Sequence, residues 1–414
     1  MFKKNKISKT QINKSANLPI SNIPVCSNES KIINHRNCVP DGTPLSVASF
    51  QPNAKPFITS SSFIPTSSTS SSSLYMENLS VKIWELYSST RQSPLKYEKK
   101  VRLLNALHMV VSGVFENAGL YIVGSSINGF GSNQSDMDMC LLVTSRDLHQ
   151  KSEATFILSR LLQSLRKCRF LYHFTLIRAK VPIIKFCDRY TGIDCDLNVN
   201  NVNGLYNTYL LAMYAKIDWR VRPLGVFIKH WAQCLDIHDA QRGRLSTYCL
   251  LLMLIHYLQP LASHQFYLIC KKSFQYVFVY NLFNYTMEPY ELDMNIELPW
   301  NELQSNNSNS LAELFTGFIY YYTNQFDFNK WAISIRHKTP FMKHIAMKHL
   351  PPYEQGYIVR NCKIFIEEPF SQTNAARSVH SDNIVSYIKQ AFIKTNEILS
   401  DQYPLESIMN IRNN

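Results

Sequence analysis

The segment GSSINGFGSNQSDMDMCLLV, residues 124–143, determines how the middle of this chain folds. Asp136 and Asp138 stand at positions i and i+2 of an apolar run, so their carboxylates project from the same face of a predicted strand. Two carboxylates placed in this way can hold a hard cation such as Mg²⁺ jointly. Ahead of them, the Gly124-Ser125 turn offers backbone N–H groups and a hydroxyl to an anion such as a triphosphate. The segment therefore predicts a site for a nucleotide and metal ions.

A third carboxylate on a neighbouring strand would complete a site for two metal ions, which lie about 3.5–4 Å apart and clamp a phosphoryl group during its transfer. Asp194 and Asp196 are both candidates, because they are themselves an i, i+2 pair on a predicted strand. Spacing does not rank one above the other. An Asp-x-Asp pair on an exposed strand is commonly just solvated, so the glycine–serine turn upstream is what favours metal binding here.

Around this segment the sequence predicts an α/β unit with a mixed sheet, because its strands and helices do not alternate as in a doubly wound fold. A helix before the unit is expected to end at Pro94. The helix after Pro94 has an expected apolar stripe of Tyr97, Val101, Leu104, Met109, Val111 and Val114. Apolar runs then predict strands at residues 120–123, 137–143, 182–187 and 193–199, and helical spacing predicts a helix at 153–165.

From Leu210 onward the pattern is mainly helical. Helices are predicted at residues 221–231, 245–257 and 311–322, whereas residues 260–310 lack a clear period and are expected to form an irregular connection. The longest strongly apolar run, residues 248–258, is too short to span a bilayer, so no membrane partner is expected.

Residues 1–75 are rich in Asn, Ser, Pro and Lys, which predicts a disordered basic arm. The arm has eight Lys and Arg against two Asp and Glu, so it contributes 8 − 2 = +6 to the net charge of +13. A mitochondrial presequence is an alternative, but a bias towards Lys and Asn rather than Arg favours a solvated arm. The net charge indicates a polyanionic partner, nucleic acid or an anionic membrane, and charge alone does not choose between them. Because no RRM, KH or zinc-knuckle motif is present in the sequence, RNA affinity is expected to come from a salt-sensitive basic surface.

Residues 124–143 resemble the hG[GS]…DhDh motif of the DNA polymerase β nucleotidyltransferase superfamily. More narrowly, the chain is similar to the noncanonical cytoplasmic poly(A) RNA polymerases of the germline-development type. The similarity continues in order outside the arm and most of residues 260–310. It includes VPIIKF (181–186), DLNVNN (196–201), NTYLLAMYAKIDWRVRPL (207–224), IKHWAQ (228–233), GRLSTYCLLLMLIHYLQ (243–259), LAELFTGFIYYY (311–322) and EEPFSQTNAARSV (367–379).

This resemblance implies an α+β protein. A polymerase β-like nucleotidyltransferase domain with a mixed sheet, residues 96–209, is expected to pack on a mostly helical central (PAP-associated) domain. The helical domain would comprise residues 76–95 and 210–400, and residues 401–414 would form a C-terminal tail. ATP and the RNA 3′ end are expected in the cleft between the two domains.

The resemblance also selects one acid of the second pair. The family's third metal-binding aspartate opens the DLNVNN strand, which corresponds to Asp196, whereas Asp194 has no counterpart with a role. Asp136, Asp138 and Asp196 are therefore the expected catalytic and metal-binding residues, and the expected cofactors are two Mg²⁺ or Mn²⁺ ions.

Nine positions match residues that bind ATP in the family. Ser125, Lys229 and Thr247 match contacts to the triphosphate, Asn207 matches an asparagine that reads the ribose, and Tyr248 matches the aromatic on which the base stacks. The full set is Gly124, Ser125, Asn207, Lys229, Thr247, Tyr248, Glu368, Thr373 and Asn374. Relatives often have a second lysine four residues after the first, where this chain has Gln233.

The base-recognition loop favours adenine over uracil. Uridylyl-adding relatives tend to have a histidine just before the asparagine that matches Asn374, but here Thr373 precedes it directly. A histidine would crowd a purine and offer uracil a hydrogen bond, so its absence leaves room for adenine. Glu368 is the expected acceptor at the edge of the base.

The sequence as a whole predicts an enzyme, a template-independent RNA adenylyltransferase that adds AMP from ATP to RNA 3′ ends. The alternatives are a terminal uridylyltransferase of the same fold and a scaffold without catalysis that only binds RNA. The resemblance implies a separate RNA-binding protein for target selection and a cytoplasmic location, with mitochondrial and nuclear locations as alternatives.

Overall fold

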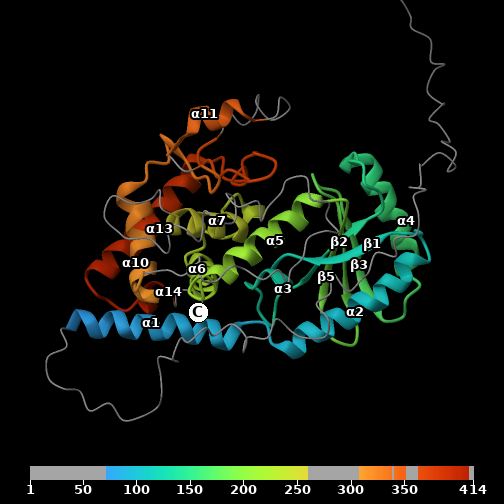
Figure 1. The fold of residues 1–414 in the computed structure, drawn as a ribbon, viewed down its shortest axis with the longest axis horizontal. Coiled ribbons are helices and arrows are strands. Elements are labelled where there is room, and N and C mark those ends of the chain that lie inside the picture. Colours follow the sequence, from blue (N-terminus) through green and yellow to red (C-terminus); the bar gives the residue numbers. More distant parts are fainter. Residues whose placement is uncertain (1–70, 260–306, 338–339, 351–361, 410–414) are drawn as a thin grey trace, which may run out of the picture.

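The computed structural model describes residues 71–259, 307–337, 340–350 and 362–409 (Figure 1). The predicted arm, apart from residues 71–75, and most of the predicted irregular connection at 260–310 lie outside these residues. Within them, no helix combines the length and the apolar character needed to cross a bilayer.

One half of the described chain is built on a five-stranded sheet in the order β1-β2-β5-β4-β3. The strands are β1 (Gly119–Val123), β2 (Met137–Leu142), β3 (Leu171–Ile177), β4 (Ile183–Asp188) and β5 (Asp194–Val199). Strands β2 and β5 are parallel and the other pairs antiparallel, so the predicted mixed sheet is confirmed. Strand β3 was not predicted. It lies at the edge of the sheet, where most of its side chains are only partly buried, and so it lacks a clear apolar period.

One face of the sheet is covered by α2 (Pro94–Ser112) and α4 (Thr155–Leu165), which share an apolar core with the inward-facing strand residues (Figure 1). The stripe predicted for α2 was partly wrong, because Met109 is 78% exposed. The helical period buries Lys100, Leu103, Leu104, Leu107 and Val111 instead.

Pro94 begins a helix rather than ending one. Helix α1 (Ser71–Thr90) ends before it, and Ser93 caps α2 by accepting a hydrogen bond from Lys96 N. Proline is favoured at the first helical position, since its missing N–H would have no intrahelical partner there. Helix α1 also begins within the serine-rich tract, so residues 71–75 are helical and do not belong to the predicted arm.

The other half of the described chain is helical and has a single large aromatic core (Figure 1). Its helices are α1, α5 (Val202–Ile217), α6 (Val221–Cys234), α7 (Thr247–Leu258), α10 (Leu311–Tyr320) and α13 (Asp382–Ser400). Trp231 of α6 lies at its centre, with ring contacts to Phe315 and Phe392, and its indole N–H donates to Thr395. The predicted domain boundary between residues 209 and 210 falls inside α5, which contacts both the sheet and the other helices.

Residues near the C-terminal end of the described chain contact α1. Helix α14 (Glu406–Met409) lies in the predicted tail, and Leu405 just before it is buried in the helical core. Glu406 forms an ion pair with Lys82 of α1 at 2.5 Å, and Tyr75 donates a hydrogen bond to Tyr403 O. Residues 403–406 are therefore packed against the rest of the fold.

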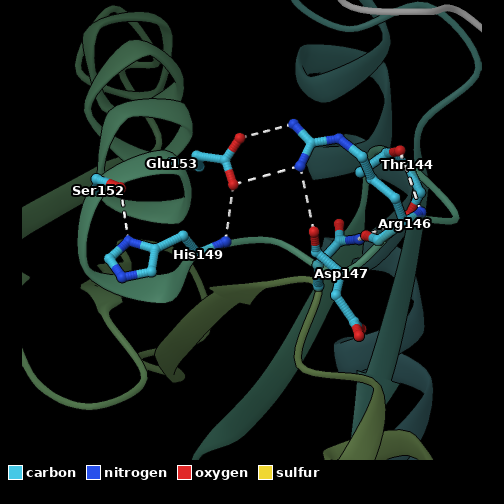
Figure 2. Close-up of polar contacts among 7 residues, drawn as sticks. Thr144, Arg146, Asp147, His149, Ser152 and Glu153 are labelled. Atoms are coloured by element: carbon cyan, nitrogen blue, oxygen red, sulfur yellow. Dashed lines mark hydrogen bonds and ion pairs between the residues drawn. The ribbon is translucent and has the colours of Figure 1, made fainter.

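The loop after β2 is fixed by polar contacts. The side chain of Asn200 accepts from Val143 N and donates to Thr144 O. Farther along the loop, Glu153 accepts hydrogen bonds from the Arg146 guanidinium and from His149 N (Figure 2). These bonds lower the pKa of Glu153 to about 2, and the hydrogen bond from Arg146 is the larger cause. The loop therefore leads β2 into α4 along a defined path.

Candidate active site

The three predicted catalytic acids lie together on the face of the sheet that α2 and α4 leave uncovered. Asp138 of β2 stands directly opposite Asp196 of the parallel strand β5. Asp136 is the residue before β2. Along β5, Cys195, Leu197 and Val199 point into the sheet core, so the alternating positions place Asp196 on the opposite face. The structure thus brings Asp136, Asp138 and Asp196 to one place.

The pKa values of Asp136 and Asp138 are raised by their surroundings. Burial is the largest cause at Asp138, and with the neighbouring charges of Asp196 and Asp136 it raises the pKa of this carboxyl to about 6. Burial and Asp196 also raise the pKa of Asp136. Lys185 of β4 lies opposite Asp196, and its Nζ is 2.7 Å from an Asp196 oxygen. Lys185 and the buried Lys100 partly offset three crowded carboxylates, an arrangement that a cation would stabilise further.

The donor set fits a divalent ion of the Mg²⁺ class, because all three side chains offer hard carboxylate oxygens. Among the residues that the structure describes, no three His, Cys, Asp or Glu side chains are grouped closely enough to form a metal site by themselves. The Asp196 carboxylate is engaged by Lys185. Asp194 is exposed and stands beyond the register position of Asp138, and its charge contributes to raising the pKa of Asp136 but not that of Asp138. Position therefore favours Asp196 over Asp194 as the third ligand.

The glycine–serine turn lies against the acids. Gly124 has a φ of 68°, and a Cβ at this position would lie 2.6 Å from Asp138 Oδ2, so only glycine fits. Its N–H donates to Thr208 Oγ1 of α5 at 2.8 Å. Ser125 is half-buried at the start of α3 (Ser125–Asn128), a helix of a single turn. The structure thus places Gly124 and Ser125 beside the predicted metal ligands, as a triphosphate contact requires.

Three other predicted ATP-binding residues form one hydrogen-bonded network. Tyr248, in the first turn of α7, donates to Asn207 Oδ1 of α5 at 2.6 Å. The same hydroxyl lies 3.2 Å from Glu368 Oε1, a second acceptor. Segments distant in the sequence thus meet at Tyr248.

The remaining oxygen of Glu368 holds its own loop. Glu368 Oε2 accepts from the backbone N–H groups of Phe370 and Ser371, and Glu368 N donates to Thr373 O. Asn374 is only 1% exposed. Its amide accepts from Ile366 N and donates to Ile364 O. Thr373 and Asn374 therefore shape the loop that presents Glu368, and their contacts are with the loop itself rather than with the Tyr248 network.

Lys229 and Thr247 flank the site from the helical half. Lys229 of α6 is half-buried, which lowers its pKa, while the charges of Asp136 and Asp138 act in the opposite direction. The Lys229 ammonium is therefore close enough to Asp136 and Asp138 to interact with their charges. Thr247 Oγ1 lies 2.7 Å from His238 Nε2, a residue that the sequence did not single out.

The comparisons with known proteins agree with this geometry. A model of the central palm domain of mitochondrial-like poly(A) RNA polymerases matches residues 79–216, and a model of the Cid1 family of poly A polymerases matches residues 310–374. Poly(A) RNA polymerase GLD2 from Homo sapiens is 36% identical over 344 residues, which cover 81% of this chain and 67% of the relative. The chain belongs to the GLD2 family of poly(A) RNA polymerases. The resemblance predicted from the sequence is thereby confirmed.

Solved structures of the same family share the fold. A GLD-2/RNP-8 complex matches with a TM-score of 0.67 and 32% identity over 81% of this chain and 98% of the other. A Cid1 poly(U) polymerase with MgGTP bound matches with a TM-score of 0.65 and 25% identity over 80% of this chain and 98% of the other. The predicted α+β nucleotidyltransferase fold is therefore confirmed, and membership in this family implies the use of divalent metal ions. The chain spans less of some GLD2 relatives, such as 34% of gld-2 from Caenorhabditis elegans.

Sequence reasoning missed three residues at this GLD2-type site: Lys100, Lys185 and His238. Lys100 could have been found, because it shares the helical face of Leu103, Leu104 and Leu107, where a charged residue is unexpected. Lys185 alternates with the buried Ile184 and Phe186, but only the pairing of β4 with β5 shows that it faces Asp196.

Proposed function

We propose that the chain is a template-independent adenylyltransferase that joins AMP from ATP to the 3′ hydroxyl of RNA. The observation that supports this most directly is the alignment of Asp138 with Asp196 beside the Gly124 turn, in a member of the GLD2 family. A bond forms between the RNA 3′ oxygen and the α-phosphorus of ATP, the bond to pyrophosphate breaks, and pyrophosphate leaves. A scaffold that only binds RNA would need neither the three acids nor the turn.

The residues divide this work between them. Asp136, Asp138 and Asp196 would hold two divalent ions, Mg²⁺ or Mn²⁺, which when bound neutralise charge on the transferring phosphoryl group and make the 3′ hydroxyl a better nucleophile. Ser125 and Lys229 bind the triphosphate and orient it towards the acids. Lys229 also draws pyrophosphate away, because its ammonium opposes the charge of the leaving group.

The Tyr248 network selects the nucleoside. Asn207 binds the ribose hydroxyls, and the ring of Tyr248 stacks on the base, while its hydroxyl keeps Asn207 and Glu368 in place. Glu368 accepts a hydrogen bond from the exocyclic amine of adenine, which uracil lacks. The loop that holds Glu368 has no histidine to fill the space that a purine needs.

Incorporation of the four nucleotides tests this assignment. The protein is incubated with a short oligo(A) RNA, each NTP in turn and Mg²⁺ or Mn²⁺, and the extended products are resolved by length. AMP is expected to exceed UMP by about tenfold or more, the range that one or two base contacts provide. A preference for UTP would establish the uridylyltransferase alternative, and no extension with any nucleotide would contradict both.

A histidine at the base loop should move the preference towards UTP. Insertion of histidine between Thr373 and Asn374 is expected to change the ATP-to-UTP ratio of kcat/KM by roughly ten- to a hundredfold, because imidazole takes purine space and can bond to uracil. Thr373→His is a companion variant that keeps the loop length, which matters because the amide of Asn374 supports the loop backbone. If both variants lower the two rates equally, base choice is made elsewhere.

Target selection is proposed to depend on a separate RNA-binding protein. GLD-2 relatives have been solved in complexes with RNP-8 and with GLD-3. The sequence of this chain has no RRM, KH or zinc-knuckle motif to select an RNA by itself. A cytoplasmic location is proposed from the same family resemblance.

A further inference from the structure

Lys100 of α2 is a fully buried lysine, with an exposed fraction of 0%. Its neighbours on the same helical face are Leu103, Leu104 and Leu107, which belong to the core beneath the sheet. An ammonium group in such surroundings is strongly destabilising unless all of its hydrogens are used. A buried lysine of this kind therefore needs an explanation from its partners.

Lys100 Nζ makes three hydrogen bonds, one for each of its protons. It donates to Ser126 Oγ at 2.8 Å, to Ser135 O at 2.9 Å and to Asp136 O at 3.0 Å. Ser126 Oγ in turn donates to Asp136 O at 3.2 Å. The ammonium and the serine hydroxyl thus close a ring of polar contacts beneath the site.

These acceptors come from the two parts of the site that must cooperate. Ser126 follows Ser125 in the triphosphate turn, and Asp136 is a predicted metal ligand at the entrance to β2. Nine residues separate Ser126 from Asp136 along the chain, so the turn and the acid are not fixed to one another by sequence distance. Lys100 joins them through the main-chain carbonyl of Asp136, which leaves the carboxylate free for its own role.

The same loop is attached to the helices by contacts that do not involve Lys100. Gln92 Nε2 donates to Ser126 O at 2.8 Å, and Gln92 N donates to Gly131 O at 2.9 Å. Ser93 N donates to Asn133 Oδ1 at 2.8 Å. Because these bonds already hold the loop in the fold, the particular contribution of Lys100 is the spacing between the turn and Asp136.

We infer that Lys100 is a positioning residue, which sets the triphosphate turn and the Asp136 segment at a fixed separation so that one nucleotide can contact both. This inference rests on the proposed nucleotidyl transfer. Without Lys100, the Ser126 Oγ–Asp136 O bond and the β1–β2 pairing are left to set the separation of the turn and the acid. The two can then shift relative to one another, and a displacement of about 1 Å in a reacting group can lower a rate by about a hundredfold.

The test compares Lys100→Met, Ser126→Ala and the double variant with the wild type. Lys99→Met is the matched control, since it removes the same charge from an exposed neighbouring position. For each protein, kcat and KM for ATP are measured on oligo(A) RNA, ATP affinity is measured by calorimetry, and Tm is measured in parallel. A wild type without activity would contradict the proposed function itself and is seen before any variant is compared.

Lys100→Met is expected to lower kcat/KM for ATP by about tenfold to a hundredfold, with a higher KM and weaker ATP binding, while Lys99→Met stays at the wild-type value. Ser126→Ala should raise KM for ATP by a smaller factor. The double variant should lose more than Lys100→Met, because it also removes the Ser126 Oγ–Asp136 O bond, but less than the sum of the two single effects, because the Lys100–Ser126 bond is shared. A lower Tm with an unchanged KM would show a merely structural lysine and overturn the inference. If Lys100→Met does not fold, Ser126→Ala decides, and an unchanged KM there overturns it equally.

Discussion

Asp138→Asn is expected to abolish AMP addition and at the same time to raise the Tm of the protein in EDTA at pH 7.5. The loss of activity, on the order of a thousandfold or more, follows because the acids act as a unit on the metal ions. The gain in stability follows from the raised pKa. Burial and the charges of Asp196 and Asp136 raise the pKa of Asp138 to about 6 in the fold, from its ordinary value of 3.8.

The difference between the folded and the ordinary pKa of Asp138 determines whether stability rises or falls with pH. The folded carboxyl holds its proton more tightly than the unfolded one, so its contribution to stability is present below pH 3.8 and is lost as the pH rises through 6. Asparagine cannot ionise and avoids this loss. The difference in Tm between Asp138→Asn and the wild type should therefore shrink when the pH is lowered from 7.5 to 5.

Extension of oligo(A) at saturating ATP, together with thermal unfolding at both pH values, measures the two effects. Asp147→Asn is a suitable control, because Asp147 is an exposed acid in the loop after β2 (Figure 2). A folded Asp138→Asn protein that retains substantial activity would contradict the assignment of this acid as a metal ligand.

Asp196→Asn and Asp194→Asn form the second decisive comparison. Asp196→Asn is expected to lose activity as completely as Asp138→Asn, since Asp196 lies opposite Asp138 on the adjacent strand. Asp194→Asn should stay within about twofold of the wild type, because Asp194 is exposed and is not one of the charges that raise the pKa of Asp138.

Single-turnover extension with each variant, at several Mg²⁺ and Mn²⁺ concentrations, separates weaker metal binding from slower chemistry. Equal losses in the two variants would mean that β5 was identified correctly but that the choice of residue was wrong. Asp196→Asn also releases Lys185, whose positive charge then acts on Asp136 and Asp138 alone and lowers their pKa further.

The sequence predicted the part of the site that depends on local spacing. Gly124 follows β1 directly and Asp138 lies in β2, the next strand along the chain, so the close approach of the glycine to the acid depends on the pairing of two consecutive strands. The preference for Asp196 over Asp194 came from resemblance, because both acids project from the same face of β5. Only strand pairing, which spacing does not encode, places Asp196 beside Asp138.

Other features could not be predicted, for physical reasons particular to each. Strand β3 buries only Leu171 fully, so its sequence shows no apolar alternation. Lys100 was passed over because a lysine is usually exposed, and three acceptors from another segment keep it buried here. The bonds of the Asn374 amide to the backbone of its own loop could not be predicted from spacing. Such contacts depend on tertiary packing, which a single sequence does not display.

The contact between the two ends of the described chain affects the order in which the two halves of the protein can fold during synthesis. The whole sheet half, from α2 to β5, is contiguous and is complete once residue 199 has emerged. Helix α1 emerges earlier still, but its packing partners α6 and α10 are made later. Lys82 of α1 can pair with Glu406 only near the end of synthesis. At about 5–20 residues per second, synthesis of the chain from residue 199 to Glu406 takes on the order of ten to forty seconds. Throughout that time the acid-bearing face of the sheet is formed while the helical half that faces it is still being made.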